Sequence, residues 1–385
     1  VSELRRTYRH RIYPTAEQAA ALETQLGQAC DLYNAALEHR KRMWRDHGVS
    51  VTWHQQSAEL KHLRARGLLD ATANFSSQQD ALRRLDRAFQ AFFRRVKAGE
   101  KPGYPRFRAR QRYDTLTWSF AGNSGGCQIK EGRLTLQGVG QVKVKWHRQI
   151  PPEAKLCTVQ VKRQGLRWYA CFSLDEVPTV PLPATGRVIG VDLGISTFAA
   201  LSTGEMIAGP RANRAGAKAV RRAQRKVSRR KRGSSRRRKA VVLLARQRER
   251  EANRRRDHAH KTARMLVQRF DVIAVENLNV RGLAKGMLAR DCNDQGWATF
   301  LAYLHDKAES AGREIILVNP SNTSQACSAC GTLVPKTLGV RVHLCACGYR
   351  ADRDVNAARN ILARATGPDG AVRRQQWGDE ARAVA

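Results

Sequence analysis

Four cysteines in the C-terminal part of the chain have the spacing of a metal site. Cys327 and Cys330 form a C-x-x-C pair, Cys345 and Cys347 form a C-x-C pair, and 14 residues separate the pairs. Four thiolates presented by two turns match tetrahedral Zn²⁺, and a glycine after each pair suits a zinc ribbon. Because sulfur takes all four positions, the pattern predicts one structural zinc ion. The C-x-C pair is tighter than usual.

Three acidic residues form the second candidate site. Asp192 ends an apolar strand in "VIGVDLG", Glu276 ends another in "VIAVEN", and Asp354 lies at the start of a helix in "DRDVNAARN". Three converging carboxylates repel one another unless divalent cations lie between them. Two Mg²⁺ ions about 4 Å apart can stabilise both the attacking water and the leaving 3′-oxygen of a phosphodiester. The set therefore predicts two-metal phosphodiester hydrolysis.

A fourth acid, Asp352, lies two residues before Asp354 and so faces another side of the helix. An aspartate immediately before a helix commonly caps its first turn. We therefore predict Asp352 as the N-cap and Asp354 as the metal ligand.

The order of the predicted elements explains how distant carboxylates meet. Three short strands, which we expect to be antiparallel, follow residue 186, and then helix, strand, helix, strand and helix alternate. This is the order of an RNase H-like sheet, in which the strand that ends in Glu276 lies beside the strand that ends in Asp192. The last helix then brings Asp354 across both strand ends. A zinc ribbon just before this helix can brace its start and flank the site.

The upstream half of the chain predicts helices and a separate β domain. Thr15 and Gln18 form a capping box for an amphipathic helix that reaches about Trp44, and a second helix fits Ser76 to Lys97. Short alternating strands between residues 113 and 176 predict an antiparallel barrel or sandwich. The Pro-rich stretch "VPTVPLPATG" follows as a domain boundary.

The charge of the chain points to a polyanionic partner. Its 70 Lys and Arg against 33 Asp and Glu give a net charge of +37. No apolar run approaches the ~20 residues that span a bilayer, so nucleic acid fits better than a membrane. The odd number of nine cysteines and the absence of an apolar leader segment lead us to expect reduced thiols in the cytoplasm or nucleoid.

Residues 211–260 carry the densest positive charge, with 21 basic and three acidic residues. Their pattern predicts a helical hairpin with its turn at 233–235. The candidate phosphate contacts near the turn are Arg236, Arg237, Arg238 and Lys239. A solvated hairpin that acts only through its general field is the alternative.

Two upstream surfaces also suit nucleic acid. The polar face of the second helix carries Arg83 and Arg87, although a solvated helix face is the simpler interpretation of each arginine. The loop "KAGEKPGYPRFRARQR" interleaves aromatic and basic residues, among them Tyr104 and Arg106. The aromatic rings can stack on bases, and the basic side chains can contact phosphates.

At these residues the sequence resembles the TnpB family, accessory nucleases of bacterial insertion sequences that are related to type V CRISPR effectors. "VIGVDLGISTFAALSTG", "VIAVENLNVRGL" and "CGYRADRDVNAARNIL" look like the three RuvC motifs of that family, the last with its zinc ribbon. The resemblance covers essentially the whole chain, and the C-x-C pair is its one mild departure.

The resemblance implies a multidomain α+β protein with three parts. These are an antiparallel β-barrel wedge domain (1–13 and 113–186), a helical recognition domain (14–112), and a RuvC/RNase H-like nuclease domain (187–385) that contains the basic hairpin 211–260 and the zinc ribbon 321–351.

The implied activity is that of a bacterial RNA-guided DNA endonuclease with two catalytic Mg²⁺ ions and one structural Zn²⁺. A guide RNA from the end of the element would select double-stranded target DNA by base pairing, and the protein would read a short adjacent motif. The "FSSQQ" stretch, with Ser77 and Gln78, is the expected reader of that motif. The guide sequence, the cut positions and the choice between monomer and homodimer stay open.

Three other functions compete. A transposase that joins DNA ends uses the same three carboxylates. A nuclease-inactive, RNA-guided DNA-binding repressor would need none of them, and all three are present. An actin-like phosphotransferase also contains "GVDLG", but the charge, the zinc ribbon and the lack of a second glycine loop for phosphates disfavour it.

Overall fold

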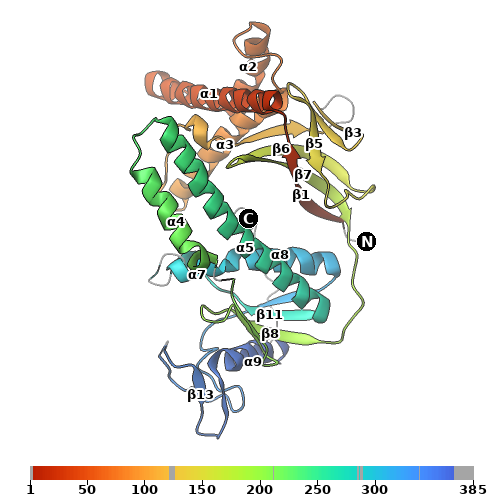
Figure 1. Ribbon diagram of the computed structural model, residues 1–385, viewed down its shortest axis with the longest axis vertical. Coiled ribbons are helices and arrows are strands. Elements are labelled where there is room, and N and C mark those ends of the chain that lie inside the picture. Colours follow the sequence, from red (N-terminus) through yellow and green to blue (C-terminus); the bar gives the residue numbers. More distant parts are fainter. Residues whose placement is uncertain are drawn as a thin grey trace. The chain divides into compact units, whose positions relative to one another are not determined.

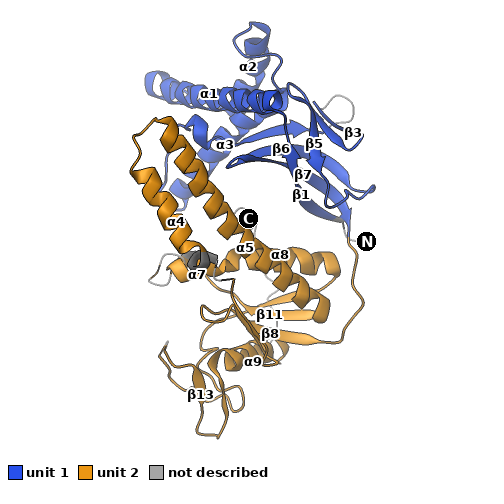
Figure 2. Cartoon of the chain, in the orientation of Figure 1, with its two compact units in different colours: residues 1–178 blue, residues 179–385 orange. Residues whose placement is uncertain are grey.

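The computed structural model describes residues 3–120, 126–210, 212–283, 286, 289–337 and 339–367. The chain divides into two compact units, residues 1–178 and 179–385, which Figure 2 shows in blue and orange. Their boundary falls inside the Pro-rich stretch 177–186. Each unit has its own apolar core. None of the helices in the described ranges combines the length and apolarity needed to cross a membrane.

The first unit is built on a seven-stranded sheet in which every neighbouring pair is antiparallel. The strand order is β2-β6-β7-β1-β5-β4-β3. The strands are β1 (Glu3–Tyr13), β2 (Thr115–Ser119), β3 (Cys127–Lys130), β4 (Arg133–Leu136), β5 (Gly140–Lys145), β6 (Lys155–Gln164) and β7 (Arg167–Pro178).

The opening strand β1 is central in this sheet, where it pairs with β7 from Glu3 opposite Pro178 to Ile12 opposite Trp168. Buried and more exposed residues alternate along β5 and β7, as expected of a sheet with one face on a core. The described strands of this unit form one sheet, and its edge strands β2 and β3 do not pair with one another, so these strands do not close the predicted barrel.

Helices α1 (Ala16–His47), α2 (Trp53–Ala65) and α3 (Phe75–Lys97) belong to the same unit, followed by the short helix η1 (Arg110–Arg112). The capping box is confirmed, since Thr15 and Gln18 each accept a hydrogen bond from the backbone N–H of the other. Gly48 follows the last residue of α1 as its C-cap, and its φ of 64° suits glycine. Helix α2 was not among the predicted elements, although Thr52 and Gln55 form a second capping box at its start.

The second unit contains the predicted RNase H-like sheet, in the order β10-β9-β8-β11-β12. Its strands are β8 (Val188–Asp192), β9 (Ala199–Leu201), β10 (Met206–Ile207), β11 (Val272–Glu276) and β12 (Glu314–Val318). The first three are antiparallel, whereas β11 runs parallel to both β8 and β12. The expectation that the strand of Glu276 lies beside the strand of Asp192 is therefore confirmed.

The helices of this unit are α4 (Ala212–Ser228), α5 (Ser235–Arg269), α6 (Val280–Leu283), α7 (Ala289–Gln295), α8 (Trp297–Ala311) and α9 (Arg353–Thr366). Figure 1 shows α4 and α5 side by side as a long hairpin. Residues 229–234 join the two helices, so the turn overlaps the predicted one at 233–235 but begins earlier. The α5 helix continues beyond the predicted end at 260. Its last turns bury Ala263, Leu266 and Val267 in the core, at helical spacing.

The α9 helix packs directly on β8 because of one glycine. A Cβ atom on Gly190 would lie 2.1 Å from the carbonyl oxygen of Ala358 and 2.9 Å from the backbone nitrogen of Leu362. No other residue type fits that gap without moving the helix. The small hairpin of β13 (Val342–Leu344) and β14 (Arg350–Asp352) leads directly into the start of α9.

Candidate metal sites and nucleic-acid surfaces

The sheet and α9 bring the three predicted carboxylates toward one edge. Asp192 is the last residue of β8 and Glu276 is the last residue of β11. Because these strands are parallel neighbours, both side chains lie at the same end of the sheet. Asp354 lies in the first turn of α9. Its Oδ2 is 3.6 Å from the point that a Cβ atom would occupy on Gly194, which comes just after β8.

The electrostatics of this edge follow from burial and mutual repulsion. Burial raises the pKa of Asp192 well above its ordinary value, and the charges of Glu276 and Asp354 raise it further. Burial likewise raises the pKa of Glu276 and of Asp354. The nearest ion pair to the site is weak, with Arg341 Nη1 3.9 Å from Asp354 Oδ2. The three carboxylates therefore carry negative charge that the described residues compensate only in part. Hard oxygen ligands of this kind fit Mg²⁺.

The carboxylates are more widely spread than the ligands of one ion. In the described part of the chain, only the four cysteines and the set His305, Asp306 and Glu309 have all their ligand atoms within 4.8 Å of one another. The three carboxylates at the edge of the sheet are therefore not spaced as the ligands of one tightly held ion. The His305 set lies on one face of α8.

Asp352 has the predicted capping role. Its Oδ1 accepts hydrogen bonds from the backbone N–H groups of Asp354, at 2.8 Å, and Val355, at 3.3 Å. This cap fixes the start of α9, and so it fixes the first turn that carries Asp354.

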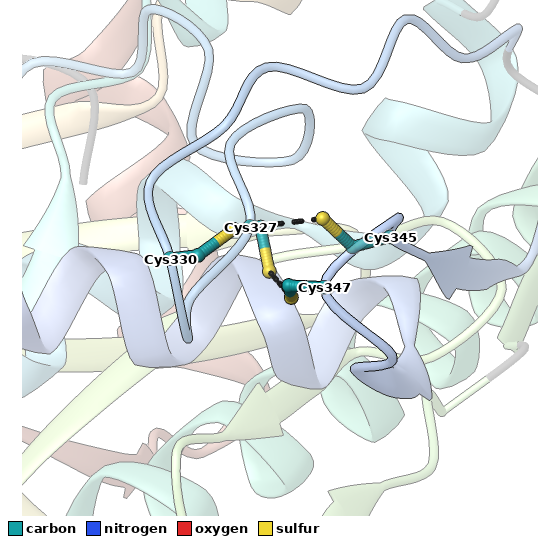
Figure 3. Close-up of side chains that lie close together, drawn as sticks. All are labelled: Cys327, Cys330, Cys345 and Cys347. Carbon is teal, nitrogen blue, oxygen red and sulfur yellow. Dashed lines mark hydrogen bonds between the residues drawn. The ribbon is translucent and has the colours of Figure 1, made fainter.

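The cysteines form a cluster with the dimensions of a zinc site (Figure 3). The Sγ atoms of Cys327 and Cys347 are 3.8 Å apart, and those of Cys330 and Cys345 are 3.5 Å apart. Two sulfurs of a tetrahedral zinc with Zn–S bonds of about 2.3 Å are about 3.8 Å apart. The C-x-C pair therefore reaches the required geometry, and the cluster fits a structural zinc ion.

Local hydrogen bonds shape the two cysteine turns. Each glycine after a pair has a positive φ, 79° at Gly331 and 85° at Gly348, and donates its N–H back into its turn. Hydrogen bonds with Thr332 lower the pKa of Cys330 to about 6. At Cys347 the hydrogen bond with the Tyr349 backbone is outweighed by those with the other cysteines, which raise the pKa of Cys347 to about 12. Without a metal the cluster therefore favours the thiolate at Cys330.

A residue that the sequence analysis missed, Thr323, contacts the carboxylate edge. Its hydroxyl donates a hydrogen bond to Glu276 Oε1, and both side chains are buried. The only local signal was its position just after the strand "REIILVNP" and ahead of the first cysteine.

The basic hairpin contains a pocket of about 500 Å³ that the sequence analysis did not predict. It is lined mainly by α4 and the residue that follows it, with Glu251 from α5 and one residue from α7. Four arginines line it: Arg221, Arg225, Arg229 and Arg290. Among the described residues, none of these four forms an ion pair, and the first three follow one another at helical i, i+4 spacing.

Of the predicted hairpin contacts, Arg237 has an internal partner. Its Nη1 donates to the carbonyl oxygens of Val227, at 2.7 Å, and Arg230, at 3.1 Å, and so closes the turn. Arg236, Arg238 and Lys239 are exposed, whereas Arg237 is partly buried. Nucleic-acid contact by this group stays a prediction.

The candidates of the first unit differ in accessibility. Ser77 and Gln78 are buried, and their side chains hydrogen-bond to the Thr117 carbonyl and to Arg64. Arg83, Arg87 and Arg106 are exposed. Tyr104 is 45% exposed and packs edge-on against Phe89 and Phe92. Nucleic-acid contact by any of them remains a prediction.

Three family models match the chain. The OrfB_IS605 model, described as a probable transposase, matches residues 160–287, and the Cas12f1-like TNB domain matches residues 297–361. A helix-turn-helix domain model matches residues 4–48. In this structure those residues form strand β1 and one continuous helix, α1, so the name of that model does not describe their conformation.

Two relatives that match most of the chain agree with these family matches. A Streptomyces pristinaespiralis protein named as an RNA-guided DNA endonuclease is 36% identical over 94% of this chain and 90% of its own length. The Escherichia coli K12 protein InsQ, named likewise, is 27% identical over 74% of this chain and 73% of its own length.

A solved structure supports the fold. The protein of a Cas12f1–sgRNA–target DNA complex superimposes with a TM-score of 0.59 over 95% of this chain and 99% of its own, at 14% identity. With the RuvC-like motifs on an RNase H-like sheet and a relative that matches along nearly its whole length, the chain belongs to the TnpB family.

Proposed function

We propose that this protein is an RNA-guided DNA endonuclease that hydrolyses target phosphodiesters at Asp192, Glu276 and Asp354. One observation carries the proposal. Carboxylates from three separate segments lie at one edge of an RNase H-like sheet, where two end neighbouring parallel strands and the third starts the helix that packs on the first of them. The names of two relatives that match most of this chain support the guided activity.

The three carboxylates would hold two Mg²⁺ ions, which supply charge stabilisation for the attacking water and the leaving 3′-oxygen. The protein contributes rigidity, because two of the ligands end paired strands and the third starts a capped helix. Gly190 brings α9 against β8, and Thr323 holds one oxygen of Glu276. Arg341 and Arg353 place positive charge near Asp354, and such charge would stabilise a phosphate bound at the carboxylates.

The partners of this proposal are a guide RNA from the end of the element and a double-stranded target with a short adjacent motif. The net charge of +37 and the arginine-lined pocket of the hairpin support polyanion binding. The structural relative Cas12f1 was solved with RNA and target DNA. In this assignment residues 1–13 and 113–186 form the wedge domain, 14–112 the recognition domain, and 187–385 the nuclease domain of a nucleoid-associated bacterial protein.

The test is cleavage of a plasmid with the protein purified together with its RNA. The RNA is sequenced, its guide segment is rewritten to match a chosen plasmid, and cutting is measured with Mg²⁺ present. The proposal expects cutting only where guide and target match. Asp192→Ala should be inactive, whereas Asp257→Ala, which removes an exposed acid on α5, should cut normally.

Two outcomes would replace the proposal. Joining of DNA ends without any RNA would favour a transposase. Guide-dependent binding of the wild-type protein without any cutting would favour a repressor, despite the intact carboxylates.

A further inference from the structure

A single segment between β12 and the first cysteine pair touches both metal sites. Thr323 lies in it and is 4% exposed, and its hydroxyl donates to Oε1 of Glu276, with the Pro320 carbonyl oxygen as a second acceptor at 3.1 Å. Cys327, a member of the zinc cluster, follows four residues later. The segment therefore links the zinc cluster to a carboxylate of the sheet edge.

Two asparagines of α9 fasten this segment. Asn360 Nδ2 donates to the carbonyl oxygens of Thr323, at 2.8 Å, and Ala326, at 2.7 Å. Asn356 Nδ2 also donates to the Ala326 carbonyl, at 2.7 Å, and its Oδ1 accepts from the Ser328 N–H at 2.9 Å. Asn356 is fully buried and Asn360 is 9% exposed, so water does not compete strongly for these bonds. The helix that carries Asp354 thus sets the position of the Thr323 backbone.

The contact with Glu276 is one-sided. Among the described residues, a hydrogen bond reaches Oε1 and none reaches Oε2. The terminal torsion of a glutamate is broad, so a buried carboxylate without such a bond samples many orientations. A hydroxyl that holds one oxygen fixes the plane of the group and leaves the other oxygen available. Ligating carboxylates are commonly oriented in this way by outer hydrogen bonds.

We propose that Thr323 is a positioning residue for the nuclease site, which orients Glu276 for cation binding and is itself held by Asn356 and Asn360. The inference rests on the proposed function, since it gives Glu276 a cation to bind. It also assigns the zinc ribbon a role in the geometry of the carboxylate edge.

The test measures cation binding apart from cleavage. Mn²⁺, which accepts the same oxygen ligands as Mg²⁺, is titrated into the purified protein without DNA, and bound ion is counted from the electron paramagnetic resonance of free Mn²⁺. Thr323→Val removes the hydroxyl, Thr323→Ser keeps it, and Glu276→Ala defines the loss expected without the carboxylate. Thr262→Val removes a buried hydroxyl elsewhere in the same unit.

We expect Thr323→Val to weaken the Mn²⁺ affinity that depends on Glu276 by about 10–100-fold, the usual effect of losing an outer-shell partner. Thr323→Ser and Thr262→Val should bind like wild type, and zinc content should be unchanged in all variants. If Thr323→Val loses zinc, Thr323→Ala gives the same comparison without the valine methyl groups. Wild-type affinity in the valine and alanine variants would overturn the inference, as would an equal loss in Thr323→Ser.

The outcome is separable from the proposed function. If wild-type protein binds Mn²⁺ through Glu276 but cuts no guide-matched DNA, the nuclease proposal fails and the titration still decides the role of Thr323. If the Mn²⁺ affinity of wild type and Glu276→Ala is the same, the positioning role is overturned as well.

Discussion

At the scale of single residues, Asp192 is the carboxylate whose surroundings shift its pKa most clearly toward the protonated form. It is half-buried at a strand end, and Glu276 and Asp354 lie close enough to raise its pKa further. A carboxylate in such a place destabilises the folded protein when it is ionised. A residue that lowers stability in this way is consistent with a role in function.

Removing a ligand should therefore stop the reaction without weakening RNA binding. We predict that Asp192→Ala or Glu276→Ala lowers guided cleavage by more than about 100-fold, because losing even an outer partner of a metal ligand costs about 10–100-fold. The basic surfaces remain, so RNA should copurify in wild-type amounts. A plasmid-cutting assay with RNA quantified in each preparation measures both, and near-normal cutting would remove that residue from the site.

The same carboxylate gives a stability prediction. Because the folded-state pKa of Asp192 is raised above 3.8, folding favours its protonated form, and the ionised form destabilises the protein at higher pH. In buffer without added Mg²⁺, Asp192→Asn should raise Tm at pH 8, by about 2–4 °C for each kcal/mol gained.

The sign of this effect can be checked by its pH dependence. The gain from Asp192→Asn should shrink as pH falls through the raised pKa and disappear below about 3.8. Added Mg²⁺ should also reduce the gain, because the ion stabilises only the wild-type site. Thermal melts from pH 3.5 to 8 measure it, and a gain that is constant over this range would contradict the explanation.

At the scale of elements, α9 is the part on which both metal sites depend. It carries Asp354, its asparagines hold the segment that contains Cys327, and it lies directly on β8 at Gly190. The zinc ribbon precedes it, so folding of the ribbon and placement of the third carboxylate are connected.

We predict that Gly190→Ala destabilises the second unit by about 1–3 kcal/mol, the usual cost of overpacking. The added methyl group would lie 2.1 Å from the Ala358 carbonyl oxygen, so α9 has to move away from β8. Cleavage should fall as well. Gly339→Ala is the matched control, because its Cβ position has no atom within 4 Å. Equal melting temperatures for the two variants would refute the close-packing argument.

The zinc ribbon gives the next prediction. Cys330→Ser should lower zinc content and folding yield together, because a closed four-thiolate site contributes its binding energy to local folding. Cys157→Ser, which changes an exposed cysteine outside the cluster, should leave both unchanged. Elemental analysis and limited proteolysis measure the outcome. A wild-type preparation without zinc would overturn the assignment of the four cysteines.

At the scale of the whole molecule, charge is the dominant property. A net charge of +37 on 385 residues creates self-repulsion that a polyanion offsets. Much of this charge lies on the α4–α5 hairpin, where Arg221, Arg225 and Arg229 follow one another along one helix face.

We predict that replacing these three arginines by Gln flattens the slope of log affinity for RNA against log salt. Each phosphate contact contributes about 0.7–0.9 to the slope, so the change should be at most about 2–3. Base preference should hardly change, because phosphate contacts carry no sequence information.

A second triple variant serves as the comparison, in which Arg236, Arg238 and Lys239 near the turn are replaced by Gln. Both sets remove the same charge, so an effect of net charge alone would alter the two slopes equally. Binding measured from 50 to 500 mM salt distinguishes direct contact from the general field. A slope that is unchanged in both variants would leave the hairpin as a solvated surface.

Local patterns in the sequence determined the parts of this protein. The Thr15 capping box, the cysteine spacing and the apolar strands that end in Asp192 and Glu276 are short-range signals, and each predicted its element correctly. The order of the elements then predicted the RNase H-like sheet, because few connections of such strands and helices avoid crossings. An overlooked capping box shows that α2 was predictable as well.

Only the tertiary structure decided how side chains far apart in sequence meet. Thr323 and Glu276 are 47 residues apart, and nothing local to either one predicts their hydrogen bond. Arg237 turns inward to close the hairpin, and Ser77 is buried at the start of α3. Whether a polar side chain faces solvent or a partner depends on what packs over it, and that is a property of the assembled core rather than of neighbouring residues.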